Sequence, residues 1–483
     1  MMHNSSDDFA NETPDSEKLN LGTQLAFGAG DMGAAITANI GIFYTAYFLT
    51  DVAGLNPSLA GWVLLVGKIW DAINDPIVGV LSDRTQSRWG RRLPWMLYGA
   101  IPFGITFFLQ WIVPNFAGIN TENQWGLFWY YVIVSILFNA FYTVINLPYT
   151  ALTPELTLDY DERTKLNSFR FGFSIGGSIV SVIIVAIIAA MFPNDRVRQF
   201  LIVGLVCAVI SILPIYWCIW GVRDRVLAVA SRHPEIEEAV TLPIWEQLKI
   251  VWRNRPFLYV IGIYLCSWLG VQLTAAIIPY FVVSWMRLPD SVTAQVILAV
   301  QGTALAMLYV WSAVSQRVGK RGVYFMGMGL WIIAQAGLFF LQPTQVTLMF
   351  VLAIMAGFGV STAYLIPWSM LPDVIELDEL KTGQRREGIY YSFVVLLQKV
   401  CLAIAVFLVL KSLDWAGYLK PIANNPPPVQ PDAVLFAIKF AIGPLPTISL
   451  ILGLILTYFY PITREVHAEI LLKLRERKLN TKD

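Results

Sequence analysis

Charged residues are scarce in this chain of 483 residues: they make up 14% of it, whereas hydrophobic residues make up 56%. Because soluble proteins carry about 25% charged residues, this composition excludes an ordinary soluble domain and predicts a membrane protein. The formal net charge is only +1, so the chain lacks the basic excess that a nucleic-acid partner requires. The lipid bilayer is therefore the first partner that we expect.

Cysteine and histidine are also rare, with four and three residues respectively. The cysteines lie in apolar runs without metal-ligand spacing, which indicates buried thiols and no disulfide framework. His3, His233 and His467 lie outside the long apolar runs, which excludes a histidine proton relay across the membrane. Walker A, G-x-S-x-G, H-E-x-x-H and paired C-x-x-C motifs are missing from the sequence, so we expect neither an enzyme nor a resident cofactor.

Long apolar runs, in contrast, fill most of the chain. A helix needs about 20 apolar residues to cross a bilayer, and twelve segments reach that length. They predict an all-α membrane protein with twelve transmembrane helices. The predicted spans are 23–50, 56–81, 93–113, 125–153, 166–192, 199–220, 256–285, 291–315, 322–341, 346–371, 388–411 and 432–460.

Two pairs of similar segments indicate an internal repeat. The second span is followed by RWGRR at 88–92, and the eighth by RVGKR at 317–321. The fourth span ends with LPYTALTPE at 147–155, and the tenth with IPWSMLPD at 366–373. Six plus six spans with matching motifs predict two pseudo-symmetric six-helix bundles, the architecture of the major facilitator superfamily. Such duplication favours a carrier over a channel.

The predicted bundles occupy residues 23–220 and 256–460, joined by a cytoplasmic central loop at 221–255. Lys and Arg concentrate in every second loop, and basic loops stay in the cytoplasm. Residues 1–22 and the tail 461–483 are then both cytoplasmic, and the chain is a multi-pass protein of the cell membrane. Arg196 and Arg198 lie on the opposite side from this basic excess.

The second span contains KIWDAINDP at 68–76. Asp71 and Asp75 are four residues apart, so they share one face of a helix. One interpretation is a structural salt bridge with Lys68, or carboxylates wetted near the membrane surface. The other is that intramembrane carboxylates face a cavity and bind a cation. Their repulsion favours Na⁺ between them or a proton on one of them.

Three further charges lie inside apolar spans. Lys399 is a candidate for neutralising the two carboxylates when the cation is absent, and Arg170 occupies the corresponding span of the other half. Either side chain can instead snorkel or form a structural ion pair. Asp31, among glycines in the first span, is open to a functional role or to a position at a helix end near the cytoplasm.

Two loops with mixed charge follow the fourth and tenth spans. Such loops are commonly a solvated surface. The alternative is an inner gate in which acidic residues pair with the arginine motifs in one state of the carrier. The candidate gate residues are Arg88, Arg91, Arg92, Glu155, Asp373 and Arg317.

The KIWDAINDP motif and SRWGRRLPW at 87–95 resemble the glycoside–pentoside–hexuronide:cation symporters, the family typified by the melibiose permease. TDVAGL at 50–55, NLPY at 146–149 and RREG at 385–388 extend the resemblance over most of the spans. This family transports solutes together with Na⁺, Li⁺ or H⁺. The resemblance therefore implies a cation-coupled importer of a small glycoside that works as a monomer.

The resemblance also implies roles for individual residues. Asp71 and Asp75 match the cation-binding carboxylates, Thr143 an assisting threonine, and Lys399 a lysine beside the site. The sugar-binding arginine matches Arg170. An aromatic residue of the tenth span matches Tyr364, and Asp31 joins the solute candidates.

One departure concerns the solute. The two sugar-binding aspartates of the melibiose carrier align with Ala35 and Asn146, so melibiose itself is not implied, although Asn146 can still bind a hydroxyl.

A second resemblance involves PWSMLPDV at 367–374 and DWAGY at 414–418. Both are similar to the sodium-dependent lysophosphatidylcholine symporters of the same superfamily, whose substrate is an amphiphile. We expect a Na⁺-driven glycoside symporter, and a lysolipid symporter is the alternative.

Overall fold

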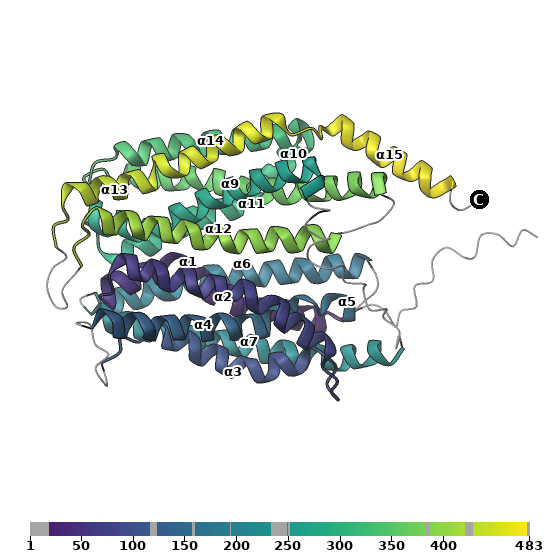
Figure 1. Ribbon diagram of the computed structural model, residues 1–483, viewed down its shortest axis with the longest axis horizontal. Helices are drawn as coiled ribbons and strands as arrows, with labels where there is room; N and C mark the ends of the chain where they lie inside the picture. Colours follow the sequence, from purple (N-terminus) through teal and green to yellow (C-terminus); the bar gives the residue numbers. More distant parts are fainter. Residues whose placement is uncertain are drawn as a thin grey trace, which may run out of the picture.

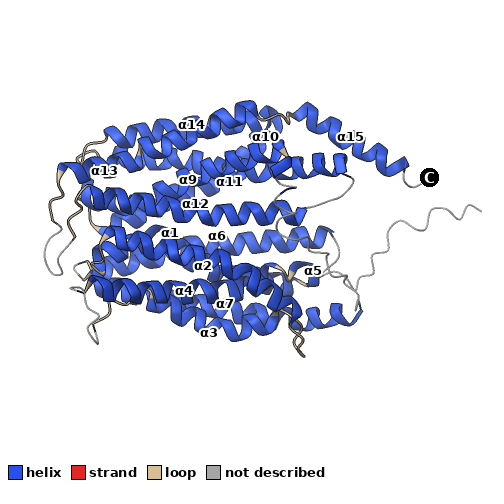
Figure 2. Ribbon diagram, in the orientation of Figure 1, coloured by secondary structure: helices blue, strands red, loops and turns tan. Residues whose placement is uncertain are grey.

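A computed structural model describes residues 19–115, 123–156, 160–193, 195–232, 249, 252–382, 387–420 and 428–480. Helices and short loops account for all of this part of the chain, which contains no β-strand (Figure 2). In a bilayer each backbone N–H and C=O needs a partner within the protein, and a helix supplies these partners within a single segment.

The helices run in the order expected from the twelve apolar segments. They are α1 (Leu21–Tyr47, extended by a π-helical turn at Phe48–Val52), α2 (Pro57–Arg84), α3 (Leu93–Leu109), α4 (Gln124–Thr150), α5 (Thr153–Leu156), α6 (Tyr160–Met191), α7 (Arg196–Arg232), α9 (Arg255–Tyr280, extended by a π-helical turn at Phe281–Trp285), α10 (Asp290–Phe340), α11 (Val346–Thr382), α12 (Glu387–Trp415), α13 (Asp432–Ile442), α14 (Pro444–Phe459) and α15 (Arg464–Asn480).

Ten helical segments of the described chain are long and apolar enough to cross a membrane. The α3 helix is apolar but shorter, and α2, which carries the two intramembrane aspartates, fills the remaining predicted position. A helix therefore lies at each of the twelve predicted spans. Two of these positions belong to α10, whose two parts meet at Gly319, where φ is +81°. Glycine adopts this left-handed conformation without the steric penalty of a Cβ atom.

The helices form two groups (Figure 1). Helices α1 to α7 lie in one half of the view, and α9 to α14 lie in the other. Within the first half α1 packs on α6 and α7, and α2 packs on α4; within the second half α10 packs on α11, and α9 on α14. Across the boundary α12 contacts α2, α10 contacts α6, and α9 contacts α1. Residues of α1, α2, α4, α6 and α12 line the cavity described below.

Several predicted loops are helical. The central loop was expected from residue 221, but α7 continues to Arg232; the charged segment after the tenth span was expected to be a loop, but α11 continues to Thr382. The predicted C-terminal tail contains α15. The helices extend beyond the predicted spans because the length of an apolar run reflects only the thickness of the bilayer. A helix can continue into water until a residue breaks it.

Candidate functional site

The α2 helix places Asp71 and Asp75 against α4. Gly67, one turn before Asp71, makes this approach possible, because a Cβ atom at this position would collide with Ser135 Oγ of α4. The close contact buries the Asp71 side chain, which is 1% exposed, while the Asp75 side chain remains 27% exposed. Asn74 on the same helix donates to the Ala140 carbonyl of α4 at 3.4 Å. Because Asp71 and Asp75 are four residues apart, both carboxylates lie on the same face of α2, and this face is turned toward α4.

Thr143 of α4 connects the two carboxylates. Its Oγ1 lies 3.1 Å from Asp71 Oδ1 and 3.0 Å from Asp75 Oδ1. A hydroxyl has one hydrogen, so it can donate to only one of the two at a time. Its oxygen also has lone pairs, and two carboxylate oxygens lie within 3.1 Å of this hydroxyl oxygen. Such a set of hard oxygen ligands suits a cation like Na⁺ better than it suits a soft metal.

Lys399 reaches this carboxylate pair from α12 of the other bundle. Its Nζ lies 2.5 Å from Asp75 Oδ2 and 3.2 Å from Asp71 Oδ2. Lys68 lies farther away, at 3.6 Å from Asp71 Oδ2, and it donates to Asn139 Oδ1 at 3.0 Å. The structural interpretation of a pair with Lys68 is therefore the weaker of the two. The Lys399 ammonium thus places one positive charge from the other bundle beside both carboxylates.

A cavity of about 420 Å³ is lined by Asp71 of the carboxylate pair, whereas Asp75 and Thr143 are not among its lining residues. Asp71, Lys399, Asn146 and Arg170 all line it, so four of the predicted residues come together there. The other polar side chains on its wall are Thr37, Thr45, Lys68, Gln110, Ser135, Asn139, Tyr142 and Gln398. This volume lies within the range of small-molecule sites, about 300–1,000 Å³. We call this space the central cavity.

Arg170 is anchored at the wall of the central cavity by Asp31. Its Nε lies 3.3 Å from Asp31 Oδ2, and its guanidinium carbon lies 5.5 Å from the centre of the Tyr149 ring. The Tyr149 hydroxyl donates to the Phe27 carbonyl at 2.8 Å, which fixes the ring. Asp31 therefore serves as the counter-ion of Arg170. A guanidinium has five donors, so the groups of Arg170 that do not face Asp31 remain available toward the cavity.

Tyr364 does not join this group. It lies on α11, is 40% exposed, and packs edge-to-face on Trp268 with ring centres 5.5 Å apart. It is not among the residues that line the central cavity. Its predicted role in binding the solute therefore lacks geometric support in this conformation.

The predicted gate residues have separate surroundings. Asp373 pairs with Lys320, whose Nζ lies 2.7 Å from both carboxylate oxygens of Asp373, while Arg317 is exposed.

The gate residues predicted in the first bundle lie elsewhere. Arg92 donates to the Ala151 carbonyl within its own bundle. Arg88 is exposed and Arg91 is partly exposed. The Glu155 side chain lies outside the described part of the structure, so the pairing predicted for it stays a prediction.

A second polar cluster, which we did not predict, joins the bundles at the end opposite α15. We call Tyr47, Asp51, Arg196, Asp290 and Tyr418 the closing cluster. Arg196 Nε lies 2.6 Å from Asp290 Oδ2, and the Tyr47 hydroxyl donates to Asp290 Oδ1 at 2.9 Å. Tyr418 donates to Asp51 Oδ1 at 2.6 Å. One feature of the sequence could have indicated this cluster. Arg196 lies in a predicted loop on the side of the membrane where the other predicted loops are poor in basic residues.

Further contacts reinforce this closure. The Tyr280 and Thr50 hydroxyls are 2.7 Å apart, and Lys420 donates to the Gly54 carbonyl at 3.1 Å and to Gln124 Oε1 at 3.2 Å. Each of these contacts connects one bundle to the other. The structure is therefore a carrier conformation in which the bundles are closed together at the end opposite α15.

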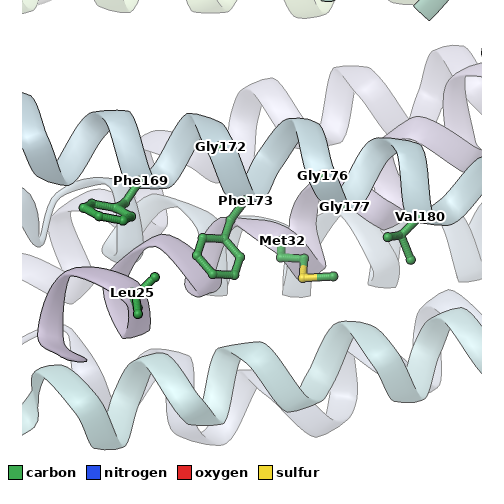
Figure 3. A pocket seen from close by; sticks show the side chains of 8 residues that line it. All are labelled: Leu25, Met32, Phe169, Gly172, Phe173, Gly176, Gly177 and Val180. Atoms are coloured by element: carbon green, nitrogen blue, oxygen red, sulfur yellow. The ribbon is translucent and has the colours of Figure 1, made fainter. Parts of the chain in front are cut away.

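A second, apolar cavity of about 600 Å³ lies between α1 and α6 (Figure 3). Leu25 and Met32 of α1 face Phe169, Phe173 and Val180 of α6 across it. Gly172 and Gly176 leave open space, since a Cβ atom at either position would meet nothing within 4 Å. Met32 and Phe169 are the sequence neighbours of Asp31 and Arg170, but none of the residues that line this apolar cavity also lines the central cavity.

These observations define a class of protein: a multi-pass membrane carrier of two helical bundles, with a charged site at their boundary. The chain belongs to the MFS/sugar transport protein family, whose model matches residues 26–464. It is a major facilitator symporter and not an enzyme.

Individual proteins agree with this assignment. An uncharacterized symporter of Synechocystis, sll1374, is 49% identical, with 96% of this chain and 98% of that protein covered. The sodium-dependent lysophosphatidylcholine symporter 1 of Mus musculus is 26% identical over 94% of this chain and 88% of its own length. The crystal structure of the nucleoside transporter NupG shares the fold, with a TM-score of 0.60 and 13% identity, covering 92% of this chain and 98% of that one.

Proposed function

We propose that this symporter uses a Na⁺ gradient to import a small glycoside or sugar by alternating access. The observation that carries the proposal is the contact of Lys399 with both Asp71 and Asp75 at the wall of the central cavity. A lysine from one bundle thus contacts both carboxylates of the candidate cation site in the other bundle. Binding of a cation there necessarily changes the interaction between the bundles.

The coupling follows from charge. Without a cation, the Lys399 ammonium neutralises part of the charge of the two carboxylates. When Na⁺ binds between Asp71, Asp75 and Thr143, the ammonium is repelled and turns toward the central cavity, where it can donate to a solute. The solute and the cation then strengthen each other's binding by the same factor, as linkage requires. Li⁺ and H⁺ are the alternative coupling ions, and no resident cofactor is needed.

The lining of the central cavity supports a hydroxyl-rich solute. Asn146 and Arg170 offer donors for sugar hydroxyls, and the Tyr142 ring on the same wall offers a surface for stacking. The family description, a sugar transport protein, agrees with such a solute.

Uptake into right-side-out vesicles tests the proposal. Labelled glycosides and a lysophospholipid are supplied with an imposed Na⁺ gradient, with an equal K⁺ gradient, and with no gradient. We expect glycoside uptake that follows only the Na⁺ gradient. Uptake that follows a proton gradient and ignores Na⁺ would overturn the choice of ion, and an absence of any gradient-driven uptake would overturn the choice of solute.

Arg170 is the residue we assign to the solute, and its replacement tests that assignment. Removing the guanidinium deletes a charge-assisted hydrogen bond worth about 1.5 kcal/mol, so Arg170→Ala should raise the solute concentration for half-maximal uptake about tenfold. Arg170→Lys keeps the charge near Asp31 but loses the planar fork, and we expect a smaller increase. An unchanged concentration in Arg170→Ala would remove Arg170 from the solute site.

A lysophospholipid is the second candidate solute, and the apolar cavity of Figure 3 favours it. An acyl chain could lie along Leu25, Met32 and Phe173, while Arg170 meets the phosphate group. The sodium-dependent lysophosphatidylcholine symporter among the relatives agrees with this alternative. Filling the cavity with Gly176→Leu separates the candidates, because it should reduce lysolipid uptake and leave glycoside uptake unchanged.

A further inference from the structure

A third cavity, of about 700 Å³, lies where α10, α11 and the start of α15 meet. It is situated at the membrane boundary, because three candidate spans end or begin beside it, at Ser315, Arg317 and Phe459. Tyr458 and Phe459 are exposed at the end of α14, as is typical of aromatic side chains at the level of lipid headgroups. The cavity is therefore within reach of a headgroup from the surrounding bilayer.

Basic side chains dominate the wall of this cavity. Four cations, Arg317, Lys320, Arg321 and Arg464, face two carboxylates, Asp373 and Glu465. Lys320 and Asp373 neutralise each other at 2.7 Å. The cations on this wall therefore outnumber the carboxylates by four to two, and a guanidinium pairs with a phosphate through two parallel hydrogen bonds.

The backbone conformation at Gly319 brings two of these arginines to the same cavity. The positive φ of Gly319 turns the chain between the two parts of α10, so that Arg317 and Arg321, on either side of the turn, line the same cavity. Arg321 also donates to the Tyr458 carbonyl at the end of α14, which holds its guanidinium next to the exposed aromatic side chains. Val318, also exposed, adds an apolar surface at the rim.

A divalent metal is the competing occupant, because Asp373, Glu376 and His467 present ligand atoms within 4.8 Å of one another. The surroundings disfavour it. Lys320 already contacts both Asp373 oxygens, and His467 Nε2 lies 2.6 Å from Glu376 Oε2. A metal ion would have to displace the lysine and would face three arginines across the cavity. An anion meets neither obstacle.

We propose that this cavity binds the phosphate group of an anionic phospholipid from the leaflet at the α15 end, through Arg317, Arg321 and Arg464. The lipid would connect the turn at Gly319 to α15, while its acyl chains follow Val318, Tyr458 and Phe459. This site is separate from the central cavity and does not depend on the solute or on the coupling ion.

Thermal unfolding of the purified full-length protein in detergent tests the proposal. The additives are dioctanoyl phosphatidylglycerol, dioctanoyl phosphatidylcholine, inorganic phosphate and Zn²⁺. We expect phosphatidylglycerol to raise the unfolding midpoint most. Because each surface arginine contributes about 1 kcal/mol to the attraction of anionic lipid, the half-effective lipid concentration should rise about fivefold in Arg317→Gln and about 25-fold in Arg317→Gln combined with Arg464→Gln.

Lys473→Gln is the matched control, since it removes one positive charge from α15 at a residue that does not line the cavity. It should respond to phosphatidylglycerol like the unmodified protein. Equal stabilisation by the two lipids, or an unchanged response of the double variant, would overturn the proposal. Inorganic phosphate that matches phosphatidylglycerol would overturn the lipid as occupant. Stabilisation by Zn²⁺ alone, lost in His467→Gln, would assign the site to a metal.

Discussion

Two charged clusters join the bundles, and they are built differently. In the closing cluster, hydroxyl donors satisfy the carboxylates: Asp51 accepts from Thr50 and Tyr418, and Asp290 accepts from Tyr47 in addition to its ion pair with Arg196. At the central site, Asp71 and Asp75 share a single threonine hydroxyl and depend on Lys399.

The difference indicates two functions. A carboxylate held by several fixed hydroxyls keeps its partners when an ion arrives, so the closing cluster fastens one end of the carrier. Two carboxylates whose main partner is the ammonium of one long lysine side chain can exchange that ammonium for another cation. The first arrangement suits stable closure of the bundles, and the second suits the exchange of the lysine for an ion that the proposed function requires.

The largest effect should come from removing a central carboxylate. Asp75→Ala deletes one of the carboxylates that we propose to bind the cation, and the closer of the two carboxylate partners of Lys399, so Na⁺-driven uptake should fall to background in vesicles. The unfolding midpoint is the control, and it should stay close to that of the unmodified protein because Asp75 is partly exposed. Full cation-coupled uptake by this variant would remove the carboxylate pair from the mechanism.

Breaking the closing cluster should open the carrier at the end where the cluster lies, opposite α15. Arg196→Ala removes a charge-assisted contact worth about 2 kcal/mol, which shifts the ratio of closed to open carriers about thirtyfold. Maleimide labelling of a cysteine introduced at Thr45, on the wall of the central cavity, measures this opening from the side of the cluster.

Arg198 offers the matched control for this experiment. It lies two residues further along α7, with its guanidinium over the Phe192 ring of its own bundle. Arg198→Ala should leave the labelling rate unchanged. Equal acceleration by the two variants would mean that general loss of charge, and not the ion pair with Asp290, controls the opening.

Thr143 allows a finer test of the central site. Thr143→Ala removes one of the oxygens that we propose to bind the cation, and the Na⁺ concentration for half-maximal uptake should rise about tenfold, which corresponds to about 1.4 kcal/mol. Thr143→Ser keeps the hydroxyl and should restore most of the affinity for Na⁺. If alanine and serine behave alike, the hydroxyl does not contact the ion.

The smallest effect is expected at Tyr418. Tyr418→Phe keeps the ring but removes one of the hydroxyl donors to Asp51, which costs about 1 kcal/mol and should increase cysteine labelling at position 45 about fivefold. An effect as large as that of Arg196→Ala would show that the hydroxyls, and not the ion pair, dominate closure.

The sequence predicted the helix positions, and it indicated several charged residues that the structure brings to one cavity, for identifiable reasons. Charges inside apolar runs are conspicuous, so Asp71, Lys399 and Arg170 were recognised as candidates, and all three line one cavity. Tyr364 was selected through resemblance alone, and the structure places it away from that cavity. The closing cluster was missed because its residues lie at span ends, where a charge needs no special explanation.

The sequence by itself determined the class of fold and the face of α2. Apolar length specifies a membrane helix because lipid offers the backbone no partner, and the i, i+4 spacing puts both carboxylates on one side whatever surrounds them. Only the tertiary structure decided their partners. Asp75 meets Lys399 across 324 residues, and Asp51 meets Tyr418 across 367. Such pairs depend on how two separately folded bundles dock, and this docking differs between the states of a carrier.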